Sequence, residues 1–209
     1  IYTQTKVKSN LRFKKNFKIK YTEKSFNNVL KKKFDLIFFL SGNSNQETSK
    51  KDIYYDLQSS FTTFIQLLES AKKNNINSTI WYASSVVVYG VNDKPLRENF
   101  ELNPVSYYAF AKLICENACK FYSRNFKLNI GILRLFSTFG PDLKRQVIYD
   151  TIKKIRSLKK FKVIGSGNEK RNFSYIDDQV KSIMKLSKKI KQPKGDVYNI
   201  ASGKTFSIK

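Results

Sequence analysis

Residues 78–90 read Ser-Thr-Ile-Trp-Tyr-Ala-Ser-Ser-Val-Val-Val-Tyr-Gly. The stretch begins as an apolar run of strand length and reaches two hydroxyl side chains, Ser84 and Ser85. A short apolar run of this kind is typical of a strand that is buried on both faces, as in a parallel sheet. Ligands of an open α/β sheet bind beyond the carboxyl ends of its strands, so the two serines lie where a binding site is expected.

The sequence on either side alternates strand patterns with helix patterns. Strands are predicted at 17–21, 34–40, 78–83 and 130–136, and helices at 25–33, 53–74 and 104–126, with Ser25 as the N-cap of the first helix. This alternation, with long crossovers, predicts a parallel α/β sheet. After Pro141 the pattern changes to a helix at 146–159, a strand at 161–164, a helix at 177–190 and a strand at 197–201.

The net charge of +24 over 209 residues raises the question of nucleic-acid binding. Asparagine, isoleucine, phenylalanine and tyrosine are abundant together with lysine, and because all five have codons rich in A and T, genome composition explains the whole set. The basic residues are also spread along the chain, as at 31–33, 153–154 and 188–189. We therefore expect no nucleic-acid partner. A content of 41% hydrophobic and 14% aromatic residues predicts a folded chain.

Cys115 and Cys119 are the two cysteines, and the chain has no histidine. A spacing of four places both thiols on one helix face. A closed zinc site needs about four ligands, so two buried thiols and no metal are expected. Without a disulfide framework, a reducing, cytoplasmic location fits. The longest apolar runs, such as 36–40, are far shorter than the ~20 residues of a membrane-spanning helix, so no membrane partner is expected. The chain opens at Ile1, which suggests a fragment or a processed piece.

Tyr108 and Lys112 are four residues apart, so they share one face of the predicted helix. A lysine ammonium beside a phenol favours the phenolate, so the pKa of Tyr108 is expected to be lowered and the side chain to serve as a general acid/base. The same spacing occurs at Tyr2/Lys6 and at Tyr149/Lys153, where a solvated lysine beside a half-buried tyrosine is the simpler interpretation. The 108/112 pair stands apart because it follows the strand that ends in Ser84 and Ser85, which favours a catalytic set of Ser85, Tyr108 and Lys112.

Further segments extend this pattern over nearly the whole chain. They are residues 34–42, 82–90 with 95–98, 104–112 with Glu116, 133–141, and 165–178 with 198–203. In this order they resemble the NAD-dependent nucleotide-sugar epimerase/dehydratase family, which are extended short-chain dehydrogenases/reductases. The resemblance implies an incomplete Rossmann-type, doubly wound parallel sheet at 1–140 that holds NAD(P) and the catalytic residues. It implies a small, partial α/β substrate-binding lobe at 141–209.

The resemblance also implies a role for each site residue. Tyr108 is the catalytic acid/base, Lys112 tunes it and binds the nicotinamide ribose, and Ser85 polarises the reacting sugar position. The implied cofactor-binding residues are Leu40, Ser41, Gly42, Ala83, Ser84, Tyr108, Lys112 and Phe136. The implied substrate-binding residues are Ser85, Ser137, Lys144, Arg145 and Arg171, with Arg171 holding the nucleotide diphosphate because a guanidinium offers a fork of donors.

The chain departs from the family pattern in four places. Its eight glycines contain no G-x-x-G-x-x-G turn, the phosphate cradle of this fold. Ser137 replaces the family's usual asparagine, and the chain ends at Lys209, short of the usual substrate lobe. The sugar 4,6-dehydratases carry an Asp-Glu pair after the serine or threonine that matches Ser85. Val86 and Val87 stand there instead, and valine cannot transfer a proton, which argues against a dehydratase.

The leading functional interpretation is a nucleotide-sugar 4-epimerase that transfers a hydride transiently to bound NAD, with a nucleotide-diphosphate sugar as its substrate. The alternative within enzymes is an NADPH-dependent nucleotide-sugar 4-reductase. Thr3, Gln4 and Lys6 lie near the end of the second strand, where an acidic residue would favour NAD, and so hint at NADP. An alternative of another class is a non-catalytic nucleotide-binding protein of the same fold. The full-length protein could form a homodimer.

Overall fold

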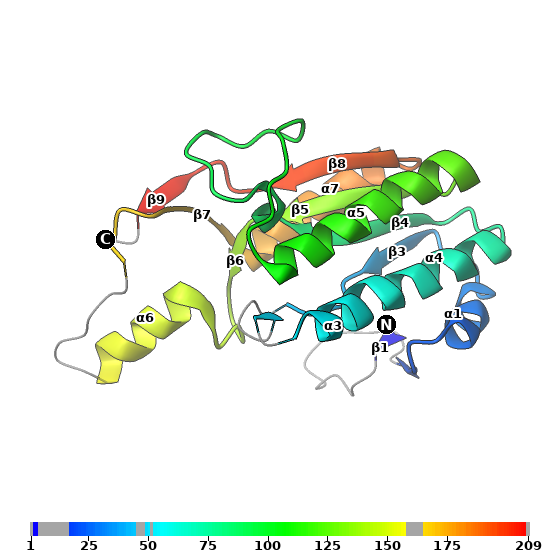
Figure 1. The fold of residues 1–209 in the computed structure, drawn as a ribbon, viewed down its shortest axis with the longest axis horizontal. Coiled ribbons are helices and arrows are strands. Elements are labelled where there is room, and N and C mark those ends of the chain that lie inside the picture. The colour runs from blue at the N-terminus through cyan, green and yellow to red at the C-terminus, as the bar shows by residue number, and fades with distance from the viewer. Residues whose placement is uncertain (1, 4–16, 45–48, 51, 158–164, 208–209) are drawn as a thin grey trace.

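The computed structural model describes residues 2–3, 17–44, 49–50, 52–157 and 165–207. Its centre is a four-stranded parallel sheet of β3 (Leu36–Phe39), β4 (Thr79–Ser85), β5 (Ile130–Leu135) and β8 (Lys194–Ile200), in that spatial order. Parallel sheets are covered on both faces, which is why their strands read as apolar runs. Figure 1 shows this sheet with helices α4 (Thr63–Lys73) and α5 (Tyr107–Phe126) across one face.

The larger hydrophobic core lies under that helical face. Helix α1 (Glu23–Leu30), α4 and α5 bury apolar side chains against β3, β4 and β5 there. Successive side chains of a strand point to opposite faces, so Ile80 and Tyr82 enter this core while Trp81 enters the one behind the sheet. That second core is closed by α7 (Ile176–Lys189) through Ile183 and Leu186. Helices on both faces of a parallel sheet confirm the doubly wound Rossmann-type class.

The expected helix at 53–74 is one continuous run with a change of pitch. It consists of α3 (Ile53–Asp56), a π-helical segment η1 (Leu57–Thr62) and α4. The prediction that Ser25 caps the first helix is wrong. Helix α1 begins at Glu23 because the extended Thr22 caps it, and the Thr22 hydroxyl accepts the Ser25 backbone N–H at 3.2 Å.

A small three-stranded sheet lies beyond the main sheet. It contains β6 (Ser137–Phe139), β7 (Lys170–Tyr175) and β9 (Thr205–Ser207), with β6 parallel and β9 antiparallel to β7. Helix α6 (Gln146–Ser157) lies beside it (Figure 1). The sequence pattern did not indicate β7, and the strand predicted at 161–164 lies outside the described residues. The lobe division at residue 140 stays a prediction, and α7 and β8 return the chain to the main sheet.

Three short elements complete the described chain. β1 (Tyr2–Thr3) pairs in parallel with β2 (Phe17–Lys18), and a 3-10 turn η2 (Val86–Tyr89) follows β4 directly. Among the residues that the structure describes, no helix combines the length and apolarity that crossing a bilayer requires.

Candidate active site

The carboxyl end of β4 and the first turns of α5 meet at one edge of the main sheet. Helix α5 begins where the extended Ser106 caps it, and the Ser106 hydroxyl accepts the Ala109 backbone N–H at 3.2 Å. Helix α5 packs on β4, so the face that carries Tyr108 and Lys112 is turned toward the strand end. The spacing of four thus places both side chains beside Ser85.

The Lys112 amine is buried in this edge, with its residue only 6% exposed. Its Nζ donates to the Ala83 carbonyl at 2.8 Å and lies 5.7 Å from the centroid of the Tyr108 ring. It also lies 5.1 Å from the centroid of the Tyr82 ring. Burial lowers the pKa of Lys112, whereas the neighbouring Cys115, Asp56 and Glu116 act in the opposite direction.

Tyr108 is half-buried, and its side chain lies beside that of Ser85. The expected lowering of its pKa by Lys112 is wrong. Burial raises the pKa of Tyr108, and it outweighs the effects of the Ser85 side chain and the Arg145 charge, which both favour the phenolate. The physical reason is that Lys112 is tied to the Ala83 carbonyl, while an enclosed phenolate loses the solvation of water.

Ser84 belongs to a buried polar network behind this edge. Its hydroxyl donates to Glu116 Oε1 at 2.5 Å, and Glu116 is paired with Arg134 at 2.6 Å, both side chains being at most 1% exposed. The Arg134 guanidinium lies 4.6 Å from the centroid of the Tyr89 ring and donates to the Glu98 carbonyl at 3.2 Å. Because the Ser84 hydroxyl is used inside the protein, the predicted contact of Ser84 with a cofactor would have to come from its backbone.

The loop after β3 forms the neighbouring part of the edge. Leu40 is 69% exposed, while Ser41 and Gly42 line a cavity of about 380 Å³ between the loop and the helix that starts at Ile53. Ser59 lines the same cavity, and among the described residues its Oγ is buried without a hydrogen-bond partner. A buried, unsatisfied hydroxyl on a cavity wall suits a polar ligand such as the cofactor, because the ligand would complete its hydrogen bonding.

Gly42 and Ser60 allow this loop to lie close to the π-helical segment η1. Gly42 has a φ of +119°, a backbone conformation that only glycine adopts readily. A Cβ at this position would lie 2.7 Å from Ser60 Oγ, which accepts the Asn43 backbone N–H at 3.1 Å. The loop is therefore held close to the π-helical segment η1.

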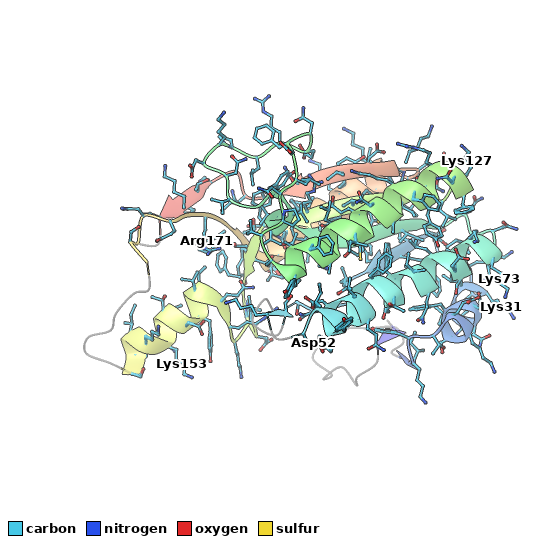
Figure 2. The ribbon with its side chains drawn as sticks, viewed as in Figure 1. Lys31, Asp52, Lys73, Lys127, Lys153 and Arg171 are labelled. Carbon is cyan, nitrogen blue, oxygen red and sulfur yellow. The ribbon has the colours of Figure 1, made fainter. Side chains whose placement is uncertain are left out.

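The five predicted substrate residues are not all at this edge. Ser85 lies beside Tyr108, and Ser137 opens β6 just beyond β5. Arg145 reaches back to the loop after β3, where it donates to the Ser44 carbonyl at 2.6 Å and to the Ser44 hydroxyl at 3.3 Å. Lys144 lies in the turn before α6, and Arg171 is exposed on β7, away from the main sheet (Figure 2).

The remaining predicted residues have simple positions. Phe136, between β5 and β6, donates its backbone N–H to the Ile200 carbonyl at 3.2 Å. Tyr149 and Lys153, which have the same spacing of four, lie on α6, which buries none of its residues. Lys153 appears in Figure 2 well apart from the sheet. Of the third pair with this spacing, Tyr2 and Lys6, Lys6 lies outside the described residues. Both cysteines are buried free thiols, and burial raises the pKa of Cys115 to about 11.

Sequence reasoning missed one buried acid at this edge, Asp56. Its side chain is fully buried near Tyr108 and Lys112. The sequence does contain a signal for it. Asp56 and Ser60 stand eight and four residues before the buried Phe64, so they continue the inward face of the helix with polar side chains.

A doubly wound parallel sheet with a Ser-Tyr-Lys cluster at the carboxyl edge of a central strand defines the class as that of the extended short-chain dehydrogenases/reductases. Residues 3–201 match the model of the NAD dependent epimerase/dehydratase family. The chain belongs to this family.

Individual relatives agree with this assignment. The chain is 28% identical over 183 residues to a putative UDP-glucose 4-epimerase of Methanocaldococcus jannaschii, covering 85% of this chain and 58% of that protein. It is 30% identical over 167 residues to UDP-glucuronate 4-epimerase 5 of Arabidopsis thaliana, covering 75% of this chain and 38% of the relative. Over these two relatives, the chain thus spans about two fifths to three fifths of their length.

Solved structures show the same likeness. The UDP-glucuronic acid 4-epimerase of Bacillus cereus, crystallised with UDP-glucuronic acid and NAD, superposes with a TM-score of 0.84 at 27% identity. The match covers 92% of this chain and 62% of the Bacillus chain. The UDP-N-acetylglucosamine 4-epimerase of Methanobrevibacter ruminantium superposes with a TM-score of 0.79, also at 27% identity, covering 96% of this chain and 66% of the other.

Proposed function

We propose that this chain forms the catalytic part of an NAD-dependent nucleotide-sugar 4-epimerase. The observation that carries the proposal is the convergence of Ser85, Tyr108 and Lys112 at the carboxyl edge of β4, where ligands of this fold bind. The relatives named above, 4-epimerases of UDP-sugars, support the same reaction. Because the chain spans only part of their length, the activity is proposed for the full-length protein.

In this proposal Tyr108 is the acid/base that takes the proton from the sugar hydroxyl and later returns it. Ser85 lies beside Tyr108 and would share the sugar oxygen with it. Proton transfer by a positioned side chain is typically worth about 10²–10⁴-fold in rate. Lys112 orients the edge through the Ala83 carbonyl and presents a positive charge beside the Tyr108 ring.

NAD, when bound, supplies the hydride acceptor and donor of the reaction. Ser41, Gly42 and Ser59 would hold it from the loop and helix side, and Lys112 would contact its nicotinamide ribose. The cavity of about 380 Å³ and the unsatisfied Ser59 hydroxyl support this part of the site. Arg171, Arg145, Lys144 and Ser137 are proposed to bind the nucleotide diphosphate sugar, and Arg145 is also tied to Ser44 on the cofactor side.

The residues after Ser85 favour epimerisation over loss of water. Val86 and Val87 open the η2 turn at the place where the dehydratases of this family carry an acidic pair. Neither valine can transfer a proton, whereas epimerisation needs only the Tyr108 acid/base and a hydride carrier. As part of the same proposal, two reduced and buried thiols suit the cytoplasm, and neither a nucleic acid nor a membrane is assigned as a partner. The homodimer expected for the full-length protein is tested by its measured mass in solution.

The test is turnover by the full-length protein with defined substrates. UDP-glucose, UDP-glucuronate and UDP-N-acetylglucosamine are incubated with the protein and NAD, and the configuration at sugar carbon 4 is followed by proton NMR. Formation of the 4-epimer without net consumption of NAD supports the proposal. Stoichiometric oxidation of NADPH with a 4-keto sugar would identify the reductase instead, and cofactor binding without either reaction would identify a binding protein.

A further inference from the structure

Asp56 is a fully buried carboxylate whose role the Ser-Tyr-Lys chemistry does not explain. It closes α3, one residue before the helix changes to π-helical hydrogen bonding. Short π-helical segments inside α-helices are frequent at functional sites. Burying a charged group is costly unless it is paired or hydrogen-bonded, so the contacts of Asp56 indicate what it is for.

Two hydrogen bonds tie the Asp56 carboxylate to the segment between β3 and α3. The Asn43 side-chain amide donates to Oδ1, and the Ser49 hydroxyl donates to Oδ2. Asn43 also donates its backbone N–H to Ser60 Oγ. One residue of the loop after β3 (residues 40–44, the cofactor-side loop) therefore contacts both Asp56 and Ser60. The loop that carries Ser41 and Gly42 is therefore fastened to the helix through Asp56.

Both donors are neutral, so neither of them brings a positive charge to the Asp56 carboxylate. Helices α3 and η1 pack against α5, the helix that carries Tyr108 and Lys112. The field of Asp56 raises the pKa of Lys112, against the larger effect of burial, and it adds to the raised pKa of Tyr108. One carboxylate thus acts on the loop by contact and on the catalytic helix by charge.

We propose that Asp56 is a positioning residue of the active site, which holds the cofactor-side loop against the helix and places a buried carboxylate beside α5, the helix that carries Tyr108 and Lys112. The loop contact serves cofactor binding and the charge serves the Ser-Tyr-Lys cluster. The inference rests on the proposed function for its catalytic part, whereas its effect on cofactor binding can be measured without turnover.

The other groups that act on this cluster come from β4, from α5 and from the segment before α6. Lys112 is faced by Tyr82 of β4 and by Tyr108, Cys115 and Glu116 of its own helix. Tyr108 is faced by Ser85 of β4 and by Arg145 from the segment before α6. Since these groups stay in place when Asp56 is changed, a shift in pH dependence would belong to Asp56.

The experiment measures NAD affinity and turnover of the full-length protein as a function of pH in the variant Asp56→Asn. Asparagine keeps an acceptor for the loop but removes the charge. Lys112 then loses its proton at a lower pH, so NAD affinity should fall at a lower pH than in the wild type. Since one titrating group changes affinity by at most about tenfold per pH unit, the ratio of wild-type to variant NAD affinity should rise with pH, by up to about tenfold per pH unit. The acid limb of the turnover profile should also move to lower pH.

Two matched variants separate charge from structure. Asp52→Asn removes an equal charge four residues earlier on the same helix, at the exposed N-cap labelled in Figure 2, and asparagine is an equally good N-cap. Its pH profiles should coincide with those of the wild type. Ser49→Ala removes one hydrogen bond to Asp56 and no charge, and should weaken NAD binding equally at every pH.

The outcomes are distinct. Coinciding pH profiles for Asp56→Asn and the wild type would overturn the charge role, and unchanged affinity in Ser49→Ala would overturn the loop role. If thermal melting shows that Asp56→Asn does not fold, Asp56→Ser replaces it with the same expected shift. A wild type that binds NAD with no 4-epimerisation refutes the proposed function alone, because the affinity profiles still report on Asp56. A wild type that binds no NAD refutes both.

Discussion

Tyr107 and Tyr108 are neighbours in the chain, yet Tyr108 lies beside Ser85, whereas Tyr107 is 50% exposed. In the full-length protein, Tyr108→Phe should lower turnover by about 10²–10⁴-fold, because it removes the group that transfers the proton. NAD affinity, measured by calorimetry, should change by less than about threefold, because the ring packing is kept. A threefold change corresponds to only about 0.7 kcal/mol. Tyr107→Phe is the matched control and should be active. Near-normal turnover in Tyr108→Phe would contradict the proposed acid/base.

The raised pKa of Tyr108 has a consequence for the pH dependence of the reaction. Because kcat/KM follows the protonation of the free enzyme, it should rise between pH 7 and pH 9 as the phenolate forms, by up to about tenfold per pH unit. The Arg145 charge lowers the pKa of Tyr108. In Arg145→Gln the acid limb should therefore move to higher pH, the opposite direction to Asp56→Asn. A profile that is flat over this range would show that Tyr108 does not titrate as the base.

At the scale of elements, α5 and β5 are joined by the buried pair of Glu116 and Arg134. Arg134→Met should destabilise the protein by about 3–5 kcal/mol, because it leaves the Glu116 carboxylate buried without its cation. The free energy of unfolding in urea measures this loss. The control is Lys181→Met, which removes one partner of the exposed pair with Asp178 and should cost less than about 1 kcal/mol. Equal effects of the two variants would show that the buried pair does not tie α5 to β5.

This ion pair also acts on the site, since Ser84 donates to Glu116 from the residue next to Ser85. The Glu116–Arg134 pair thereby fixes the end of β4 to α5 and β5, and the Lys112 amine fixes the Ala83 carbonyl. A catalytic edge that must keep hydroxyls in hydrogen-bonding positions gains from such fixed surroundings.

At the scale of the whole molecule, the absent glycine-rich turn leads to a prediction for the 209-residue chain by itself. The pyrophosphate of a dinucleotide is bound by backbone N–H groups at a helix N-terminus after that turn. The chain holds no G-x-x-G-x-x-G, so it should bind NAD and NADP more weakly than micromolar and show no turnover. Calorimetric titration tests this, with the Bacillus cereus relative, which was crystallised with NAD, as the positive control. Micromolar binding by the chain would mean that the loop after β3 and Lys112 suffice for the cofactor.

Much of the architecture and part of the site follow from the sequence. The apolar runs and their spacing predicted β3, β4, β5 and β8 and the helices between them, because burial on both faces leaves a local signature. The 108/112 spacing, together with the serines that end β4, predicted that Ser85, Tyr108 and Lys112 lie at one edge of the sheet, because residues four apart share one face of a helix. The order of the strands, the return of β8 to the main sheet and strand β7 depend on pairing between distant segments, which no local pattern contains.

The tertiary structure alone decided the electrostatics of the site. The spacing of Tyr108 and Lys112 predicted a lowered pKa for the tyrosine, yet burial raises it, because the cost of enclosing a phenolate depends on everything packed around it. Asp56 lies more than fifty residues before Lys112 in the chain, and only folding brings its charge to α5. The sequence by itself thus determined which chemical groups are available and on which face of each element they lie. Only the packing of those elements decided the hydrogen-bond partners and the dielectric surroundings in which these groups exchange protons.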